Sequence, residues 1–142
     1  MLTLIPATDL ARVWPWVRAG LERCLLKAPA HYLPEDVYHE LRAGTLTLFT
    51  FTSEKDVEGG GTAFVVLRRD ADHDGYVLFV FALAAPKGGM AWYGDELMAA
   101  LDAKAREVGA KRIRMQGRKG WSATGYFVPM ATIYEREVNH GR

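Results

Sequence analysis

The chain has 142 residues, of which 49% are apolar and 25% charged, as in an ordinary globular protein of one domain. These proportions exclude a disordered or collagen-like chain. With 18 basic and 17 acidic residues, the net charge of +1 points to no strongly charged partner.

The N-terminal residues predict a short strand followed by a helix. Residues 2–5 are apolar and stop at Pro6, which suits a strand. Thr8 and Asp9 then offer N-cap oxygens for a helix. The apolar stripe of this helix has helical spacing and consists of Leu10, Val13, Trp14, Val17, Leu21, Cys24 and Leu25.

Proline and glycine mark the limits of the first two helices. Pro15 lies within the apolar stripe, so it either kinks the first helix or opens its first turn, where proline is tolerated. A second, short helix is expected from Pro34 to about Arg42, with acidic residues in its first turn. Gly44 lies just beyond the expected end of this helix.

Three strand-like runs follow in succession. Thr45–Thr52 alternates threonine with apolar residues, and the Leu48-Phe49 pair breaks the alternation and predicts a bulge. Thr62–Arg69 follows a loop that contains glycines 59–61, which we interpret as a hairpin turn. Tyr76–Ala84 is apolar on both faces, which predicts a central strand covered on both sides.

A helix and a strand are predicted next along the chain. The helix Gly94–Val108 is followed by Gly109, a residue typical of helix ends. Lys111–Gln116 suits a strand with Ile113 and Met115 pointing inward. The buried face of the helix is expected to carry Leu97, Met98, Leu101, Ala105 and Val108.

The last part of the chain predicts one or two helical turns and a closing strand. Arg118–Thr124 suits the turns, and Pro129–Val138 suits the strand. The order is then strand, two helices, three strands, helix, strand, helix and strand. This order indicates an α+β (α/β) fold with a mixed, mostly antiparallel sheet flanked by helices, rather than a doubly wound parallel sheet. We expect residues 1–142 to form a single domain.

The compartment follows from the cysteine content and from the absence of targeting signals. Cys24 is the single cysteine, so no internal disulfide is expected, which suits a reducing, cytoplasmic location. No apolar run approaches the ~18 residues of a membrane span, and the N-terminus lacks the basic stretch of a secretion signal. Cys24 lies on the stripe of the first helix, where a buried structural thiol is expected.

The element order resembles that of the GNAT superfamily of N-acetyltransferases. The run KRIRMQGRKGWSATGYF is similar to the end of that fold, where a strand leads to a short helix and a Gly-Phe pair, here Gly125-Tyr126. The chain also resembles short, divergent GNAT-like proteins of phages and prophages through the run from Gly117 to Trp121. The resemblance implies acetyl-CoA or another acyl-CoA as co-substrate and an amine, on a small molecule or a protein, as acceptor.

In the family, CoA lies where the fourth and fifth strands separate, with its pyrophosphate at the start of the central helix. Free N–H groups and a partial positive charge make a helix start suitable for an anion. The family pattern Gln/Arg-x-x-Gly-x-Gly/Ala falls on residues 89–94, of which only Gly94 matches. An alternative to a phosphate loop here is a plain strand-to-helix connection. The resemblance assigns CoA binding to Leu83, Ala84, Ala85, Lys87, Gly88, Gly89, Gly94, Arg118 and Trp121.

The family's usual general acid is a tyrosine four residues before the Gly-Phe pair, where this chain has Trp121. An indole N–H can donate a hydrogen bond but does not supply a proton at neutral pH. Tyr126 and Tyr134 are nearby substitutes, although Tyr126 is expected in the core and Tyr134 on the last strand. His31, in the loop between the first two helices, and Glu35, in the first turn of the second, lie on the acceptor side in the family and complete the catalytic candidates.

A basic cluster lies between residues 104 and 119, where seven Lys and Arg residues face only Glu107. In the family this side borders the 3′-phosphate of CoA. The cluster could equally steer nucleic acid through counterion release, or be a solvated helix end. A second charged run places His73 among Asp70, Asp72 and Asp74, but it lacks the calcium-loop pattern, so we expect a hydrophilic hairpin turn and no metal.

The sequence thus favours an N-acyltransferase-like protein, with weak or lost catalysis as an open alternative. In that alternative the chain is a non-catalytic binding or assembly protein of phage or prophage origin. Nucleic-acid binding through residues 104–119 is a third, weaker hypothesis. Because the length leaves no room for a separate substrate domain, recognition would use the loops of this fold or a second copy of the chain.

Overall fold

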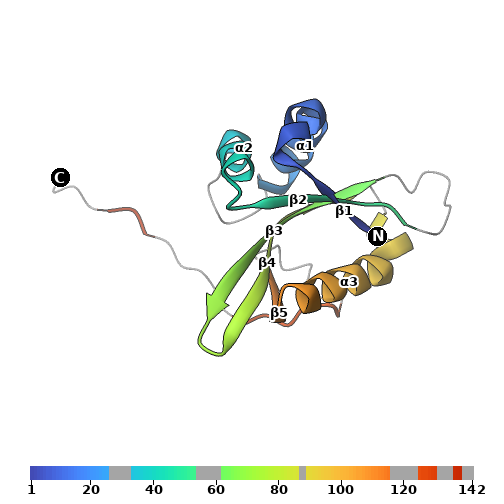
Figure 1. Cartoon of the computed structure of the whole chain (residues 1–142), viewed down its shortest axis with the longest axis vertical. Coiled ribbons are helices and arrows are strands. Elements are labelled where there is room, and N and C mark those ends of the chain that lie inside the picture. Colours follow the sequence, from blue (N-terminus) through green and yellow to red (C-terminus); the bar gives the residue numbers. More distant parts are fainter. Residues whose placement is uncertain (26–32, 54–61, 87–88, 116–124, 131–135, 139–142) are drawn as a thin grey trace.

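The computed structural model describes residues 1–25, 33–53, 62–86, 89–115, 125–130 and 136–138. In this part of the chain, a single five-stranded sheet has helices on both of its faces (Figure 1). The strands follow one another across the sheet in chain order. Their bounds are Leu2–Ile5 for β1, Thr47–Phe51 for β2, Ala63–Asp72 for β3, Gly75–Ala84 for β4 and Ala110–Met115 for β5.

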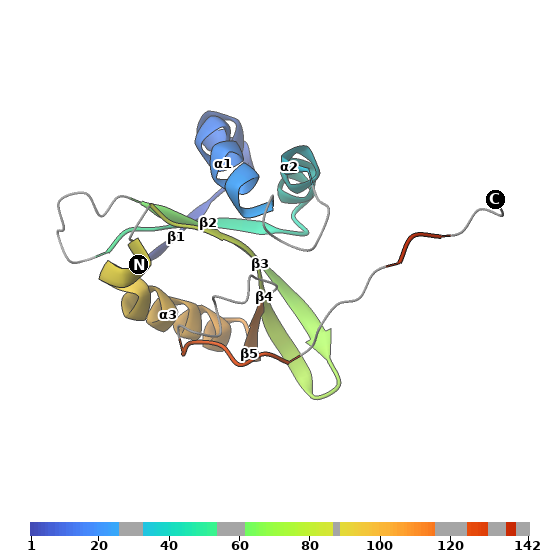
Figure 2. The ribbon, with the colours of Figure 1, turned by 180° about the vertical axis from the view of Figure 1, so that it is seen from behind.

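The helices lie on opposite faces of this sheet, α1 and α2 on one and α3 on the other (Figure 2). Their bounds are Leu10–Leu25 for α1, Pro34–Ala43 for α2 and Gly89–Glu107 for α3. Strands β1 to β4 pair antiparallel, whereas β5 pairs parallel to β4. The predicted fold class, α+β with a mostly antiparallel sheet, is confirmed.

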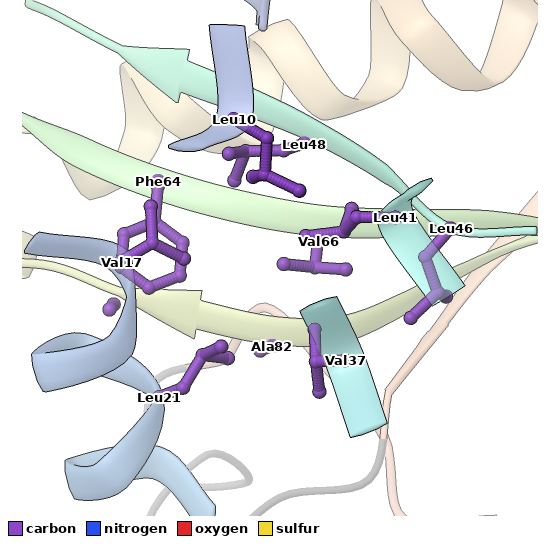
Figure 3. Close-up of a cluster of buried hydrophobic side chains, with 11 residues drawn as sticks. Leu10, Val17, Leu21, Val37, Leu41, Leu46, Leu48, Phe64, Val66 and Ala82 are labelled. Atoms are coloured by element: carbon purple, nitrogen blue, oxygen red, sulfur yellow. The ribbon is translucent and has the colours of Figure 1, made fainter. Parts of the chain in front are cut away.

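Each face of the sheet has its own hydrophobic core. The core under α1 and α2 contains Phe64, Val66 and Ala82 from the sheet, which lie opposite residues of the helices (Figure 3). The core under α3 contains Phe49, Phe51 and Leu78 together with the buried face of that helix. Because β3 and β4 are covered on both sides, the prediction of a central strand at Tyr76–Ala84 is confirmed.

The start of the first helix is formed differently from the prediction, whereas two predicted helix ends agree with the structure. A short 3-10 turn, Ala7–Asp9, precedes α1, so Thr8 and Asp9 lie inside a helical turn and do not cap a later one. Helix α1 then runs through Pro15, which lies inside it rather than in its first turn. The predicted ends at Gly44 and Gly109 are confirmed, since both glycines have positive φ, 82° and 76°.

The bulge predicted at Leu48-Phe49 is wrong. Strand β2 keeps an unbroken register with both neighbours through this pair. Leu48 belongs to the core under α1 and α2 and Phe49 to the core under α3, so two successive apolar residues fit a strand that is covered on both faces. The irregularity lies instead between β3 and β4, where Phe81 has no partner between Ala82 and Val80.

The closing strand predicted at Pro129–Val138 is not found in the described part of that range. Pro129, Met130 and residues 136–138 have no strand structure, and residues 131–135 lie outside the described residues. Pro129 has no N–H to donate to a ladder, and Met130 is exposed. The predicted helical turns at Arg118–Thr124 also lie outside the described residues. The element order is therefore as predicted from β1 through β5.

No described helix is long and apolar enough to cross a membrane.

Candidate functional site

The two parallel strands of the sheet, β4 and β5, separate part of the way along β4. Strands β4 and β5 are paired from Tyr76 to Val80, and β5 ends at Met115, opposite Val80. Directly beyond Val80 lies the bulge residue Phe81. From there to Ala84, β4 has no strand partner on the β5 side in the part of the chain that the structure describes. We call this place the β4–β5 split.

A half-buried thiol lies against the end of β4. Cys24 of α1 donates a hydrogen bond to the carbonyl oxygen of Leu83, at an Sγ···O distance of 3.2 Å. The position of Cys24 on the apolar stripe predicted a buried thiol, but the cysteine is intermediate in exposure. Next to this contact, Gly20 of α1 lies so close to Phe64 and Ala84 that a Cβ on it would overlap the phenylalanine ring. Helix α1 thus sits directly on the β3–β4 layer behind the split.

The chain enters α3 through a separate first turn. The backbone of Tyr93 is not helical, with φ −135° and ψ 19°, so the turn that starts at Gly89 is set off from the helix proper that starts at Gly94. The predicted helix start at Gly94 is therefore the start of the second, longer part. The N–H of Gly89 is paired with the carbonyl oxygen of Pro86 at 2.8 Å.

Two tyrosines lie against the glycines of this region. A Cβ on Gly89 would be 2.6 Å from the hydroxyl oxygen of Tyr93, and a Cβ on Gly94 would be 2.8 Å from that of Tyr126. Neither position has room for a side chain unless a tyrosine moves. Both glycines thus have a packing reason to be present, alongside the ligand-binding reason that the sequence offered.

Tyr126 lies on the surface of α3, and the expectation that it belongs to the core is wrong. It is 37% exposed, and its hydroxyl donates to Oδ1 of Asp95 at 2.6 Å. The hydrogen bond to this carboxylate raises the pKa of Tyr126, as does its partial desolvation. The sequence gives no sign of this contact, because 31 residues separate the two side chains.

The segment with Tyr126 borders a cleft between α3 and β5. The cleft has a volume of about 500 Å³. Its apolar side includes Met98, Ile113 and Phe127, and its rim carries Asp102 and Arg106. It lies along the outer side of β5 and is a different place from the split between β4 and β5.

Of the residues expected to hold CoA, the structure brings together those on β4 and α3. Leu83 and Ala84 form the end of β4, Ala85 follows directly, and Gly89 and Gly94 begin the two parts of α3. The remaining expected residues, Lys87, Gly88, Arg118 and Trp121, lie outside the described residues. The five described residues of the expected set therefore follow one another along the chain, from the β4–β5 split to the start of α3.

Of the expected catalytic residues, Glu35 is described and already has a partner. The guanidinium of Arg18 donates to Glu35 Oε1 from Nε at 2.9 Å, and also contacts Glu22. Hydrogen bonds from the backbone and from Arg18 lower the pKa of Glu35, which makes it a weaker base. His31, Trp121 and Tyr134 lie outside the described residues.

The basic cluster is partly neutralised by carboxylates. Lys104 is 2.8 Å from Glu107, and Arg114 is 3.1 Å from Asp72. Arg112 bridges Asp72 and Asp74 at 3.1 and 2.5 Å. The contacts of Arg112 and Arg114 give part of the cluster a local structural role, since they join β5 to the β3–β4 turn.

The same contacts explain the acidic turn. Residues 73 and 74 form a tight turn between β3 and β4, so the hairpin expected there is confirmed. Hydrogen bonds from His73 and then from Arg112 and Arg114 hold the pKa of Asp72 well below its usual value. Asp72, His73 and Asp74 are metal-ligand types within reach of one another, but two guanidinium groups share their carboxylates.

Comparison with known proteins gives a fold but no sequence relative. No protein-family model matches the chain, and no curated protein matches it in sequence. Solved structures, in contrast, match over almost the whole length. Ribosomal-protein-alanine N-acetyltransferase from Brucella melitensis has a TM-score of 0.64 and 12% identity, covering 98% of this chain and 99% of its own.

Two further structures agree with this match. An aminoglycoside acetyltransferase from an uncultured soil metagenomic sample has a TM-score of 0.65 and 12% identity, with 98% of this chain and 96% of its own covered. A GNAT family acetyltransferase from Staphylococcus aureus has a TM-score of 0.61 and 11% identity, with 97% and 98% covered. The chain therefore has the GNAT fold, as the element order predicted.

Proposed function

We propose that this protein binds acetyl-CoA or a related acyl-CoA in the β4–β5 split and transfers the acyl group to an amine. The observation that supports this most is the end of β4–β5 pairing at Val80 and Met115, directly beside the bulge at Phe81. A strand edge without a neighbour offers backbone N–H and C=O groups to an extended ligand. Acetyltransferases of the same fold are the structural neighbours of this chain.

In this proposal, backbone groups do most of the binding. Those N–H groups of residues 83–85 that point away from β3 donate to the thioester carbonyl oxygen and to the arm of the ligand. The phosphates lie near the two starts of α3, at Gly89 and Gly94, because a helix start carries a partial positive charge. The N–H of Gly89 is itself paired with Pro86, so the N–H groups that follow it in the first turn are the donors. The co-substrate supplies the activated acyl group as a thioester.

The reaction then needs little from side chains. The nitrogen of a neutral amine attacks the carbonyl carbon, a C–N bond forms, the C–S bond breaks, and the amine proton is lost. The departing thiolate is stable enough to leave into water, so Trp121 at the family's tyrosine position does not prevent transfer. Tyr126 is a poor proton donor, because Asp95 raises its pKa. The structural neighbours include a ribosomal-protein-alanine N-acetyltransferase and an aminoglycoside acetyltransferase, so both a protein and a small molecule remain candidate acceptors.

The direct test is calorimetric and thermal-shift titration with CoA and acetyl-CoA, followed by thiol release with a panel of amines. A ligand at 100 times its dissociation constant adds about 2.7 kcal/mol to the free energy of unfolding. We expect a rise in melting temperature with either ligand. The absence of binding at millimolar CoA would contradict the proposal.

A second candidate, a non-catalytic binding protein with this fold, is favoured by the contact between Tyr126 and Asp95. The first turn of the helix proper carries the carboxylate of Asp95, and Tyr126 packs against Gly94. A carboxylate at a helix start competes with a bound anion. This candidate predicts that no amine gives thiol release above the uncatalysed rate, whether or not CoA binds.

A further inference from the structure

The hydroxyl of Tyr93 is a buried polar group without a described partner. The residue is only 2% exposed, and its ring packs against Phe51 with the centroids 5.3 Å apart. Among the residues that the structure describes, no atom forms a hydrogen bond with the hydroxyl oxygen. Buried hydroxyl groups in proteins nearly always have such a bond, so this exception needs an explanation.

An unpaired hydroxyl in an apolar core destabilises the fold, because its hydrogen bond to water is lost on burial and not replaced. Phenylalanine would fill the same space without that loss. Tyr93 is therefore at odds with the packing that surrounds it, unless the hydroxyl acquires a partner in another state of the protein. Burial also raises the pKa of Tyr93, so the hydroxyl remains a donor at neutral pH.

The position of the hydroxyl indicates which partner that is. It lies directly against the α-carbon of Gly89, the first residue of α3. The N–H groups at this helix start favour an anion, and the buried hydroxyl donor is directed at the same turn. The non-helical backbone of Tyr93 separates this turn from the helix proper, so a ligand would reach the hydroxyl by displacing this one turn.

We propose that the hydroxyl of Tyr93 donates a hydrogen bond to a phosphate oxygen of CoA bound at the first turn of α3. This proposal rests on the proposed function, since it assigns a further residue to the same ligand. Tyr93 is then retained at a cost to the stability of the free protein, and the bond forms only when the ligand is present.

The test compares Tyr93→Phe with Tyr76→Phe, which removes the same hydroxyl from an exposed tyrosine at the opposite end of β4. We expect Tyr93→Phe to keep or raise the melting temperature without ligand and to weaken CoA binding about tenfold or more in calorimetry, the size expected for a hydrogen bond to a charged group. Tyr76→Phe should leave binding unchanged. Pantetheine, which has no phosphate, should bind Tyr93→Phe and the wild type equally.

Each other outcome overturns a defined statement. If the wild type does not bind CoA, the proposed function fails and the role of Tyr93 fails with it. If the wild type binds CoA and Tyr93→Phe binds equally well, the proposed function stands and the role of Tyr93 is wrong. A marked fall in melting temperature for Tyr93→Phe without ligand would show that the hydroxyl has a structural partner, and would overturn the proposal as well.

Discussion

Replacing Gly20 with alanine tests how closely α1 is seated on the sheet behind the split. A Cβ at this position would be 2.4 and 2.7 Å from two ring atoms of Phe64 and 3.1 Å from the Cβ of Ala84. Distances below 3.0 Å require a neighbour to move. Phe64 is 1% exposed and lies in the core under α1 and α2, so its ring has little free space (Figure 3).

Two opposing effects set the size of the change. Alanine stabilises a helix interior by about 1 kcal/mol relative to glycine. Adding a methyl group to a filled core destabilises the fold by about 1–3 kcal/mol. Given the two contacts below 3.0 Å, we expect the second effect to win. Gly20→Ala should lower the free energy of unfolding by up to about 2 kcal/mol.

The assay is urea denaturation followed by tryptophan fluorescence, for which the chain has four tryptophans. A second pair of variants, with and without Gly20→Ala, carries Phe64→Leu, which replaces the ring that the new methyl group would meet with a smaller side chain. In that background Gly20→Ala should be neutral or stabilise the protein by up to about 1 kcal/mol, the helix-propensity gain alone. Equal stabilisation in both backgrounds would refute the close seating of α1.

Two further substitutions test the charged groups. Asp72→Asn removes a carboxyl group whose pKa in the folded protein lies below its unfolded value of 3.8. The ionised carboxylate therefore stabilises the wild type above that pH, and the stabilisation is lost as the pH falls below 3.8. The variant should show a flatter decline in melting temperature there, and an unchanged decline would contradict the contacts with Arg112 and Arg114. Asp95→Asn removes a negative charge from the first turn of the helix proper, so CoA binding should tighten about two- to fivefold in calorimetry; weaker binding would place the phosphates elsewhere.

Helix and strand identities could be predicted from the sequence because their signals are local. The spacing of Leu97, Leu101 and Ala105 allows one buried helix face, and all three are buried. The alternation in Thr47–Phe51 is likewise a strand pattern. It misled only at Leu48-Phe49, since a strand covered on both faces needs no bulge to bury successive apolar residues.

The closing strand predicted at Pro129–Val138 is not found in the described residues of that range, 129–130 and 136–138. Alternation in Pro129–Val138 describes a chain that could pair, but pairing also requires a free strand edge within reach and N–H groups to donate. Pro129 lacks that group, and the described parts of this range join no strand. A sequence pattern does not contain the distance to a partner edge.

The candidate site was predictable in outline only. The resemblance, which rests on the element order and on residues 111–127, assigns the site to the end of the Tyr76–Ala84 strand and to Gly89 and Gly94. Other contacts near the site join residues far apart in the sequence, such as Tyr126 with Asp95 and Cys24 with Leu83. That the hydroxyl of Tyr93 has no hydrogen-bond partner among the described residues depends on its surroundings in space, which the spacing of residues along the sequence does not predict.

Amide hydrogen exchange with and without CoA, read by mass spectrometry, tests the central claim most directly. Binding in the β4–β5 split predicts slower exchange in residues 81–85 and 89–96, where the ligand covers backbone N–H groups. Helix α2, residues 34–43, lies on the face of the sheet opposite α3 (Figure 1) and should exchange at an unchanged rate. Slower exchange in α2 alone, or no change anywhere at millimolar CoA, would contradict the account.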